Sequence, residues 1–125
     1  MTIASTNKTI LDFLPELEEA LEHAGDTHTP QDVAEMVLRG DAQLWVEGDG
    51  LIITEVEEYP NGPVLNIWLA AGDMDDVLSL LPQVYGFGRW RECKTVTTLG
   101  RKGWKRVLAE DGWEDTELVY LEREL

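Results

Sequence analysis

The sequence predicts a single α+β domain, residues 1–125, in which helices flank a mostly antiparallel central sheet. Two helical segments come first, and three strands joined by tight turns follow them. The chain then alternates helix, strand, helix and strand. A chain of 125 residues with a hydrophobic fraction of 43% is long enough for one packed core. The predicted order of elements is therefore ααβββαβαβ.

The first two predicted elements are amphipathic helices. Asp12 is expected to cap a helix over residues 12–24, and its apolar face carries leucines at helical spacing. These are Leu14, Leu17 and Leu21. The second helix is predicted to begin with Thr29 as N-cap and Pro30 in the first position, and to end at Gly40.

The middle of the chain predicts three meandering strands. Gln43–Glu47 and Leu51–Glu58 flank Gly48-Asp49-Gly50, which is typical of a hairpin turn. A second tight turn at residues 59–63 leads to Val64–Ala70. The last strand is almost continuously apolar, as expected for a central strand that is buried on both faces.

The remainder predicts a helix, a strand, a helix and a strand. Asp73 is expected to cap a helix that runs to about Trp90. A strand at Lys94–Thr98, a helix at Arg101–Glu110 and a final strand at Thr116–Glu122 follow it.

The negative charge is concentrated in the first part of the chain. Residues 1–76 hold 17 acidic residues against Lys8 and Arg39, a net charge of −15, whereas residues 77–125 carry eight residues of each sign. Such a field repels phosphate backbones, so we expect no nucleic-acid partner. The charge either keeps the protein soluble or offers an acidic surface to a basic partner.

Composition and motifs exclude several other classes. No apolar run is long enough to span a membrane, and no signal peptide is recognisable, so we expect no membrane partner. The single cysteine, Cys93, fits a cytoplasmic protein. His23, Asp26 and His28 lie across a helix end and a turn, which predicts a surface turn rather than a metal site. No nucleophile elbow, phosphate-binding loop or dinucleotide fingerprint occurs.

The stretch Cys93–Glu114 carries a family resemblance. It places a β-branched run, Gly100, an amphipathic helix and Gly112-Trp113 in succession. With the preceding elements, this order resembles the Gcn5-related N-acetyltransferase (GNAT) fold. Several shorter segments resemble a family of small proteins encoded by tailed phages and prophages. They are residues 27–29, 43–45, 53–56, 59–60, 67–72 and 100–104.

The resemblance implies an acetyl-CoA site on the loop after the third strand, with backbone N–H groups approaching the pyrophosphate. The residues at that place are Leu69, Ala70, Ala71, Gly72, Asp73 and Met74. Only one glycine stands there, no basic residue is near, and Asp75 and Asp76 add further carboxylates. These carboxylates favour the helix start but oppose a phosphate, so a degenerate site is expected and no cofactor is predicted.

The resemblance also implies a general acid and a general base. A Tyr four residues before Gly112 would protonate the leaving thiolate, but this chain has Leu108 there. Tyr120 is out of register, and Tyr85 is expected to be core. Glu55 or Glu57 would be the base of an active enzyme, although alternating acids more often mark a solvated strand face.

A basic and aromatic cluster is the predicted partner contact. It comprises Arg89, Trp90, Arg91, Arg101 and Lys105. An acidic half and a basic patch on one chain favour a protein partner or a homo-oligomer.

Three functions follow from these expectations. The first is a structural or accessory phage protein, in the host cytoplasm or the virion, that acts through protein contacts. The second is an active acetyl-CoA-dependent N-acetyltransferase. The third is an acidic decoy that inhibits a host nucleic-acid-binding enzyme.

Overall fold

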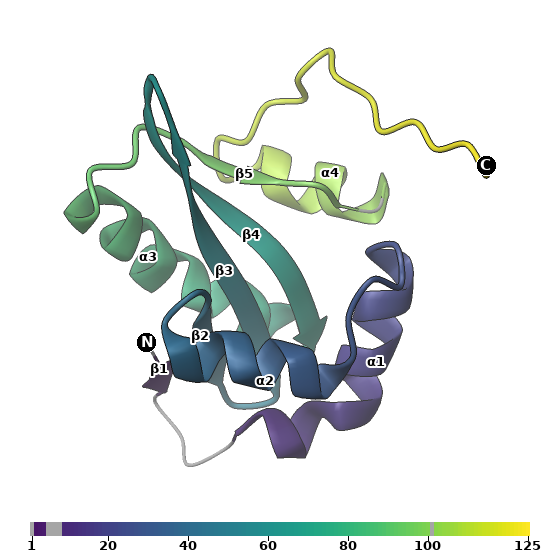
Figure 1. Ribbon diagram of the computed structural model, residues 1–125. Coiled ribbons are helices and arrows are strands. Elements are labelled where there is room, and N and C mark those ends of the chain that lie inside the picture. The colour runs from purple at the N-terminus through teal and green to yellow at the C-terminus, as the bar shows by residue number, and fades with distance from the viewer. Residues whose placement is uncertain (1, 5–8, 101) are drawn as a thin grey trace.

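A computed structural model of the chain describes residues 2–4, 9–100 and 102–125. Its strands form one sheet in the order β1-β2-β3-β4-β5 (Figure 1). The strands are β1 (Thr2–Ala4), β2 (Gln43–Glu47), β3 (Gly50–Tyr59), β4 (Gly62–Gly72) and β5 (Val96–Thr98). The meander β2-β3-β4 is antiparallel, and the outer pairs β1–β2 and β4–β5 are parallel. The predicted α+β class with a mostly antiparallel sheet is confirmed.

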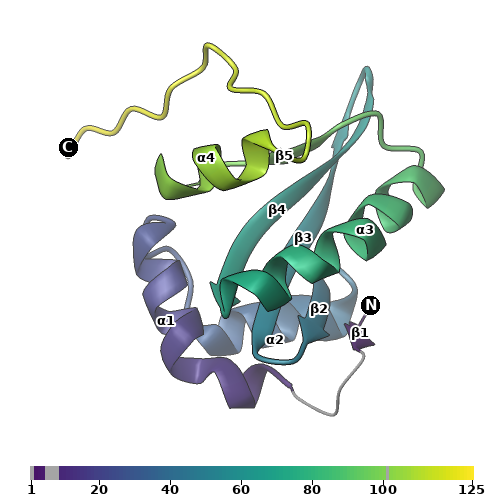
Figure 2. The same ribbon diagram turned by 180° about the vertical axis from the view of Figure 1, so that it is seen from behind.

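Helices cover both faces of the sheet (Figures 1 and 2). They are the 3-10 helix η1 (Ile10–Phe13), α1 (Leu14–His23), α2 (Pro30–Arg39), α3 (Met74–Trp90) and α4 (Lys102–Ala109). Helices α1 and α2 pack on one face, and α3 and α4 share the core of the other. No described helix is long and apolar enough to cross a membrane.

Local capping chemistry sets the helix starts. Thr29 accepts a hydrogen bond from the Asp32 N–H at 3.2 Å, and Asp32 accepts one from the Thr29 N–H at 2.8 Å. This capping box confirms the predicted start of α2. The expectation that Asp12 caps the first helix is wrong: Thr9 is the N-cap, and Asp12 is its box partner inside η1. The signal that was overlooked is Thr9, which stands directly before the apolar residue Ile10.

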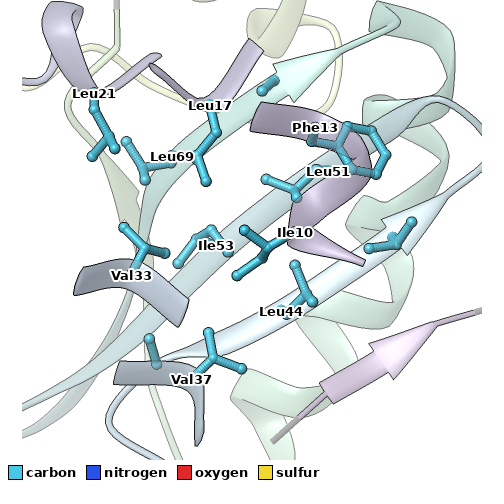
Figure 3. Packing of buried hydrophobic residues seen from close by; sticks show 13 residues of the cluster. Ile10, Phe13, Leu17, Leu21, Val33, Val37, Leu44, Leu51, Ile53 and Leu69 are labelled. Carbon is cyan, nitrogen blue, oxygen red and sulfur yellow. The ribbon is translucent and has the colours of Figure 1, made fainter. Parts of the chain in front are cut away.

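The first hydrophobic cluster lies between the sheet and the helices α1 and α2 (Figure 3). Leu17 and Val33 enter it from the helices, and Leu51 and Ile53 from β3, all with no exposed surface. The second cluster lies on the opposite face, where Leu80 and Val84 of α3 meet Ile52. Burial of such side chains contributes about 1.5–3 kcal/mol each.

Strand β4 contributes to both clusters because its pairing with β3 is irregular. Ile53 pairs with Leu69, but the next residue, Thr54, pairs with Ile67, so Trp68 is an extra residue on β4. Before the irregularity Ile67 belongs to the α3 cluster, and after it Leu69 belongs to the α1–α2 cluster. The prediction of a strand buried on both faces holds only in part, because fully buried residues alternate with partly buried ones and change face at the irregularity.

Two terminal elements differ from the prediction. The predicted strand at Thr116–Glu122 is wrong, because these residues form no helix or strand and Leu118–Leu121 are exposed. Asp115, just before this segment, pairs with Lys105 of α4 at 2.8 Å. The three-residue strand β1 was not predicted, since it is too short to show periodicity.

Candidate functional site

A cleft opens where β4 and β5 separate. The two strands pair only from Leu65–Val96 to Ile67–Thr98, and β4 then continues to Gly72 paired with β3 but without β5 beside it. Helices α1 and α4 lie on either side of this end of β4 (Figures 1 and 2). The cleft has a volume of about 510 Å³. Its lining is Asp12, Phe13, Glu16, Glu19, Ala20, Asp49, Ala70, Ala71, Gly72, Asp73, Met74, Val77 and Trp104.

Most of the predicted cofactor residues lie together in this cleft. The run from Ala70 to Met74 forms its floor at the end of β4 and the start of α3. Leu69 is not part of the lining, since its side chain is buried in the α1–α2 cluster. The sequence therefore predicted the floor, but not the walls.

The carboxylates at the start of α3 are engaged in the fold. Asp73 is the N-cap and accepts a hydrogen bond from the Asp76 N–H at 3.1 Å. Asp76 in turn accepts one from the Asp49 N–H at 2.9 Å, and the Asp73 N–H donates to the Asp49 carbonyl at 2.9 Å. The first bond caps α3, and the other two join the helix start to the β2–β3 turn, so Asp73 and Asp76 have a structural role.

Two glycines make this junction possible. A Cβ atom on Gly72, whose φ is +91°, would lie 2.0 Å from the Asp49 carbonyl oxygen. A Cβ atom on Gly50 would lie 2.6 Å from the backbone nitrogen of Val77. The turn and the helix thus approach each other more closely than side chains allow.

Few hydrogen-bond donors in the cleft are open to a ligand. Among the described residues, the N–H groups of Met74 and Asp75 have no hydrogen-bond acceptor, as is usual for the first turn of a helix. Against them stand five carboxylate side chains in the lining: Asp12, Glu16, Glu19, Asp49 and Asp73. None of the described lining residues is a lysine or an arginine. The cleft is therefore electrostatically suited to a cation and not to a phosphate.

The two predicted bases lie outside the cleft lining. Glu55 is half-buried on β3, and burial, then the charge of Glu57, raises the pKa of its carboxyl group, while His28 opposes that shift. Glu57 accepts a hydrogen bond from the Tyr59 hydroxyl. His28 packs its ring edge-on against Trp68, with centroids 4.7 Å apart. The structure thus gathers Glu55, His28 and Trp68 on the sheet face of α1 and α2, away from the cleft floor.

The candidates for a general acid are separated from the cleft as well. Leu108 is buried in the α3 cluster. Tyr85 is half-buried rather than fully core: its hydroxyl donates to Asp111 at 2.5 Å and accepts from the Trp113 indole N–H at 2.8 Å. Burial and the Asp111 contact raise the pKa of Tyr85 to about 12. The two hydrogen bonds of the Tyr85 hydroxyl connect α3 to the residues that follow α4.

The predicted partner-contact residues are spread over two sites. Trp90 is exposed at the end of α3, and its ring packs against that of Phe87 with centroids 6.0 Å apart. Arg91 lies 3.7 Å from Glu58, and Arg89 lines a second hollow of about 390 Å³ beside Cys93, whose pKa is raised by burial. Lys105 pairs with Asp115 at 2.8 Å on α4, and Arg101 lies outside the described residues.

Sequence reasoning did not identify the acidic residues of α1 that line the cleft, Glu16 and Glu19, or Trp104 of α4. Glu16 and Glu19 lie one turn apart on the polar face of α1, a spacing that the sequence shows. What it does not show is that α1 and α4 flank the same strand end. Among the described residues, no group of His, Cys, Asp or Glu side chains could hold a metal ion.

Comparisons with known proteins identify the fold. No protein-family model matches the sequence, and no curated protein is significantly similar to it. Solved acetyltransferase structures are similar in fold. A predicted acetyltransferase from Clostridium acetobutylicum, solved with acetyl-CoA, is 13% identical with a TM-score of 0.71, over 92% of each chain. The Trypanosoma brucei acetyltransferase is 14% identical with a TM-score of 0.65, over 94% of this chain and 96% of that one.

A ribosomal-protein-alanine N-acetyltransferase from Brucella melitensis is 15% identical with a TM-score of 0.64, over 93% of each chain. At such identities the similarity establishes the GNAT-like fold and leaves the chemistry to the residues of this chain.

Proposed function

We propose that this chain is a GNAT-like protein with a degenerate acetyl-CoA site that acts through protein contacts. The observation that carries the proposal is the start of α3, where the side chains of Asp73 and Asp76 accept hydrogen bonds from the backbone N–H groups of Asp76 and Asp49, respectively. We further propose, from the resemblance of several segments to small phage proteins, that it is a virion-associated or accessory protein of a phage or prophage.

The residues present do not fit a pyrophosphate. Two backbone N–H groups, those of Met74 and Asp75, are open to it, while the Asp73 N–H is already bonded to Asp49. A phosphate about 4 Å from one carboxylate is opposed by about 4 kcal/mol at an effective dielectric constant of 20. The two N–H groups contribute roughly 1.5–3 kcal/mol each as hydrogen bonds to a charged group, which the acidic lining offsets.

The same charges favour a cationic partner. Five lining carboxylates surround the hydrophobic side chains of Phe13, Met74 and Trp104. Lysine and arginine side chains of a protein partner bring both an apolar stem and a charged head to such a surface. Complementary charge would also speed the encounter and make binding sensitive to salt.

The alternative function is an acetyl-CoA-dependent N-acetyltransferase. The cleft supports it because the residues at the end of β4 form its floor, where the resemblance implies a cofactor. Glu55 would be the base, since its raised pKa is what a proton acceptor near neutral pH requires. Its position outside the cleft lining counts against this role.

Thermal unfolding with acetyl-CoA and with free CoA, each with and without magnesium, tests the proposal. An enzyme with micromolar affinity would gain about 4 kcal/mol at millimolar cofactor, or about 10 °C or more. We expect no shift. A shift of that size would overturn the degenerate site.

A matched pair of variants decides where any shift originates. Met74 is the first residue of α3, where proline is tolerated, so Met74→Pro removes one open N–H group without breaking the helix. Met74→Ala removes the side chain and keeps that N–H group. A shift lost only in Met74→Pro would show that the helix start binds the phosphates.

A lysine-rich peptide with a fluorescent label tests the protein-contact function. We expect salt-sensitive binding that weakens in the Glu16→Gln, Glu19→Gln double variant, whose residues line the cleft. The control is Glu18→Gln with Glu22→Gln, which removes the same charge from α1 at exposed positions outside the lining. Equal weakening in both variants would mean that net charge, and not the cleft, attracts the peptide.

A further inference from the structure

An exposed tryptophan is held in a fixed position at the end of α3. Trp90 is 70% exposed, and its ring lies against that of the buried Phe87, with centroids 6.0 Å apart. Phe87 in turn contacts the buried ring of Trp45 edge-on, with centroids 5.5 Å apart. The guanidinium group of Arg91 lies 5.9 Å from the centre of the Phe87 ring. These contacts lead from Trp90 into the core, while most of its own surface is left open.

Positive charge flanks this tryptophan. Arg89 and Lys94 are exposed and have no acidic partner among the described residues. Arg91 lies 3.7 Å from Glu58, and an exposed pair of this kind contributes little to stability. Tryptophan and arginine are the side chains that most often dominate the binding energy of an interface. We call Arg89, Trp90, Arg91 and Lys94 the basic patch.

The cleft at the end of β4 is the complementary surface. Its five lining carboxylates surround the apolar side chains of Phe13, Met74 and Trp104. Neither Asp12 nor Glu16 has a lysine or arginine partner in the part of the chain that the structure describes. The volume of about 510 Å³ lies within the roughly 300–1,000 Å³ of ordinary ligand pockets. The cleft can therefore receive an aromatic side chain together with a cationic one.

The two surfaces lie at opposite ends of one helix. The floor of the cleft includes the start of α3, and the basic patch is at its end, 17 residues and about 25 Å away. Figure 2 shows the start of α3 near α1 and its end on the far side of the molecule. One copy cannot place its own Trp90 in its own cleft, so a contact between these surfaces has to join two copies.

We propose that the basic patch of one copy binds in the acidic cleft of a second copy, with Trp90 against the apolar lining and the two arginines against the carboxylates. This inference rests on the proposed function and names a second copy of the chain as the cationic partner. Each copy uses one surface and offers the other, so the assembly is head-to-tail and grows into a ring or an open chain rather than a two-fold dimer.

The net charge of −15 opposes such an assembly at long range. At physiological salt, exposed charges more than about 8 Å apart are largely screened, whereas partly buried contacts are screened much less. Association should therefore be measurable at physiological salt, where the repulsion between whole molecules is weak and the contacts inside the cleft remain.

Sedimentation velocity of the full chain over a range of concentrations tests the assembly, with unfolding midpoints measured in parallel. We expect a sedimentation coefficient that rises with concentration. Trp90→Ala should raise the dissociation constant roughly thirtyfold or more, as loss of one dominant interface residue does. Arg89→Glu should also weaken association, and both positions are exposed, so the unfolding midpoint should change little. Arg106→Glu, the same charge change at an exposed position of α4, should leave association intact.

A mixture of two variants tests the head-to-tail arrangement. The Glu16→Lys, Glu19→Lys chain keeps the basic patch and loses the cleft charges, and the Arg89→Glu, Trp90→Ala chain keeps the cleft and loses the patch. We expect each to be monomeric alone. Mixed, they should form a one-to-one dimer and nothing larger, because one working patch then meets one working cleft. A mixture that stays monomeric would overturn the proposal.

Two controls separate this inference from the proposed function. The Glu18→Lys, Glu22→Lys chain has the same charge change on α1 outside the cleft lining and should assemble on its own; if it fails to, net charge and not the cleft drives association, and the inference is refuted. A wild-type chain that is monomeric at every concentration also refutes it. If the lysine-rich peptide still binds the cleft of that monomer, the proposed function stands and its partner is a different protein.

Discussion

Replacing Thr54 by valine should destabilise the fold far more than the similar size of the two side chains suggests. Thr54 is fully buried on β3, where its hydroxyl donates to the Gln43 side-chain carbonyl at 2.8 Å and accepts from the Trp45 indole N–H at 2.9 Å. Valine fills the same space but leaves both partners buried without a hydrogen bond. Each stranded group costs about 1–3 kcal/mol, so the free energy of unfolding should fall by about 2–6 kcal/mol.

Thermal and urea unfolding of Thr54→Val and Thr54→Ser measures this cost. Serine keeps both hydrogen bonds and loses one methyl group, which costs about 1 kcal/mol. For a domain of this size, 1 kcal/mol corresponds to about 4 °C in the unfolding midpoint. If Thr54→Val proves no less stable than Thr54→Ser, the hydroxyl relay does not contribute as argued.

Two further predictions concern the junction at α3 and the acid on β3. In Gly86→Ala the added Cβ atom would meet no atom within 4 Å, so this substitution in α3 should stabilise the protein by about 1 kcal/mol. In Gly50→Ala the added Cβ atom would collide with backbone atoms of α3, so this substitution should destabilise the protein by several times as much. Equal thermal unfolding midpoints for the two variants would contradict the close approach of the β2–β3 turn to α3. Glu55→Gln should stabilise the protein at pH 7, because the raised pKa of Glu55 means that folding opposes its ionisation. That gain in stability should shrink as the pH falls through the raised pKa, and it should vanish below about pH 4, where Glu55 is protonated in both the folded and the unfolded state. Urea unfolding measured from pH 3 to pH 8 tests this, and a gain that does not depend on pH would refute the argument.

The middle of the fold could be predicted from the sequence because its signals are local. Thr29 and Pro30 place the start of α2, and Gly48-Asp49-Gly50 separates two β-rich runs that pair as expected. Capping, proline and glycine act within one turn of the chain, so a single sequence displays them.

The cleft was predicted only in part, because its walls depend on distant contacts. The residues of the floor, Ala70–Met74, were indicated by the resemblance to the GNAT fold, but α1 and Trp104 arrive there through tertiary packing. The segment Thr116–Glu122 shows the opposite error: its composition favours a strand, yet a strand requires a neighbour, and composition does not supply one.

The irregularity at Trp68 has a consequence for how this chain can tolerate insertions and deletions. Removing Trp68 would give β4 a perfect ladder with β3, which ordinarily counts as an improvement. It would also leave Leu69 and Ala71 on the α1–α2 side and Ile67 on the α3 side, because Ile67 and Leu69 would become neighbours, and neighbours on a regular strand face opposite ways. Loss of Ala70 would instead make Leu69 and Ala71 neighbours and turn one of the two away from the α1–α2 cluster. A one-codon deletion is therefore compatible with both cores at Trp68, whereas at Ala70 it is not.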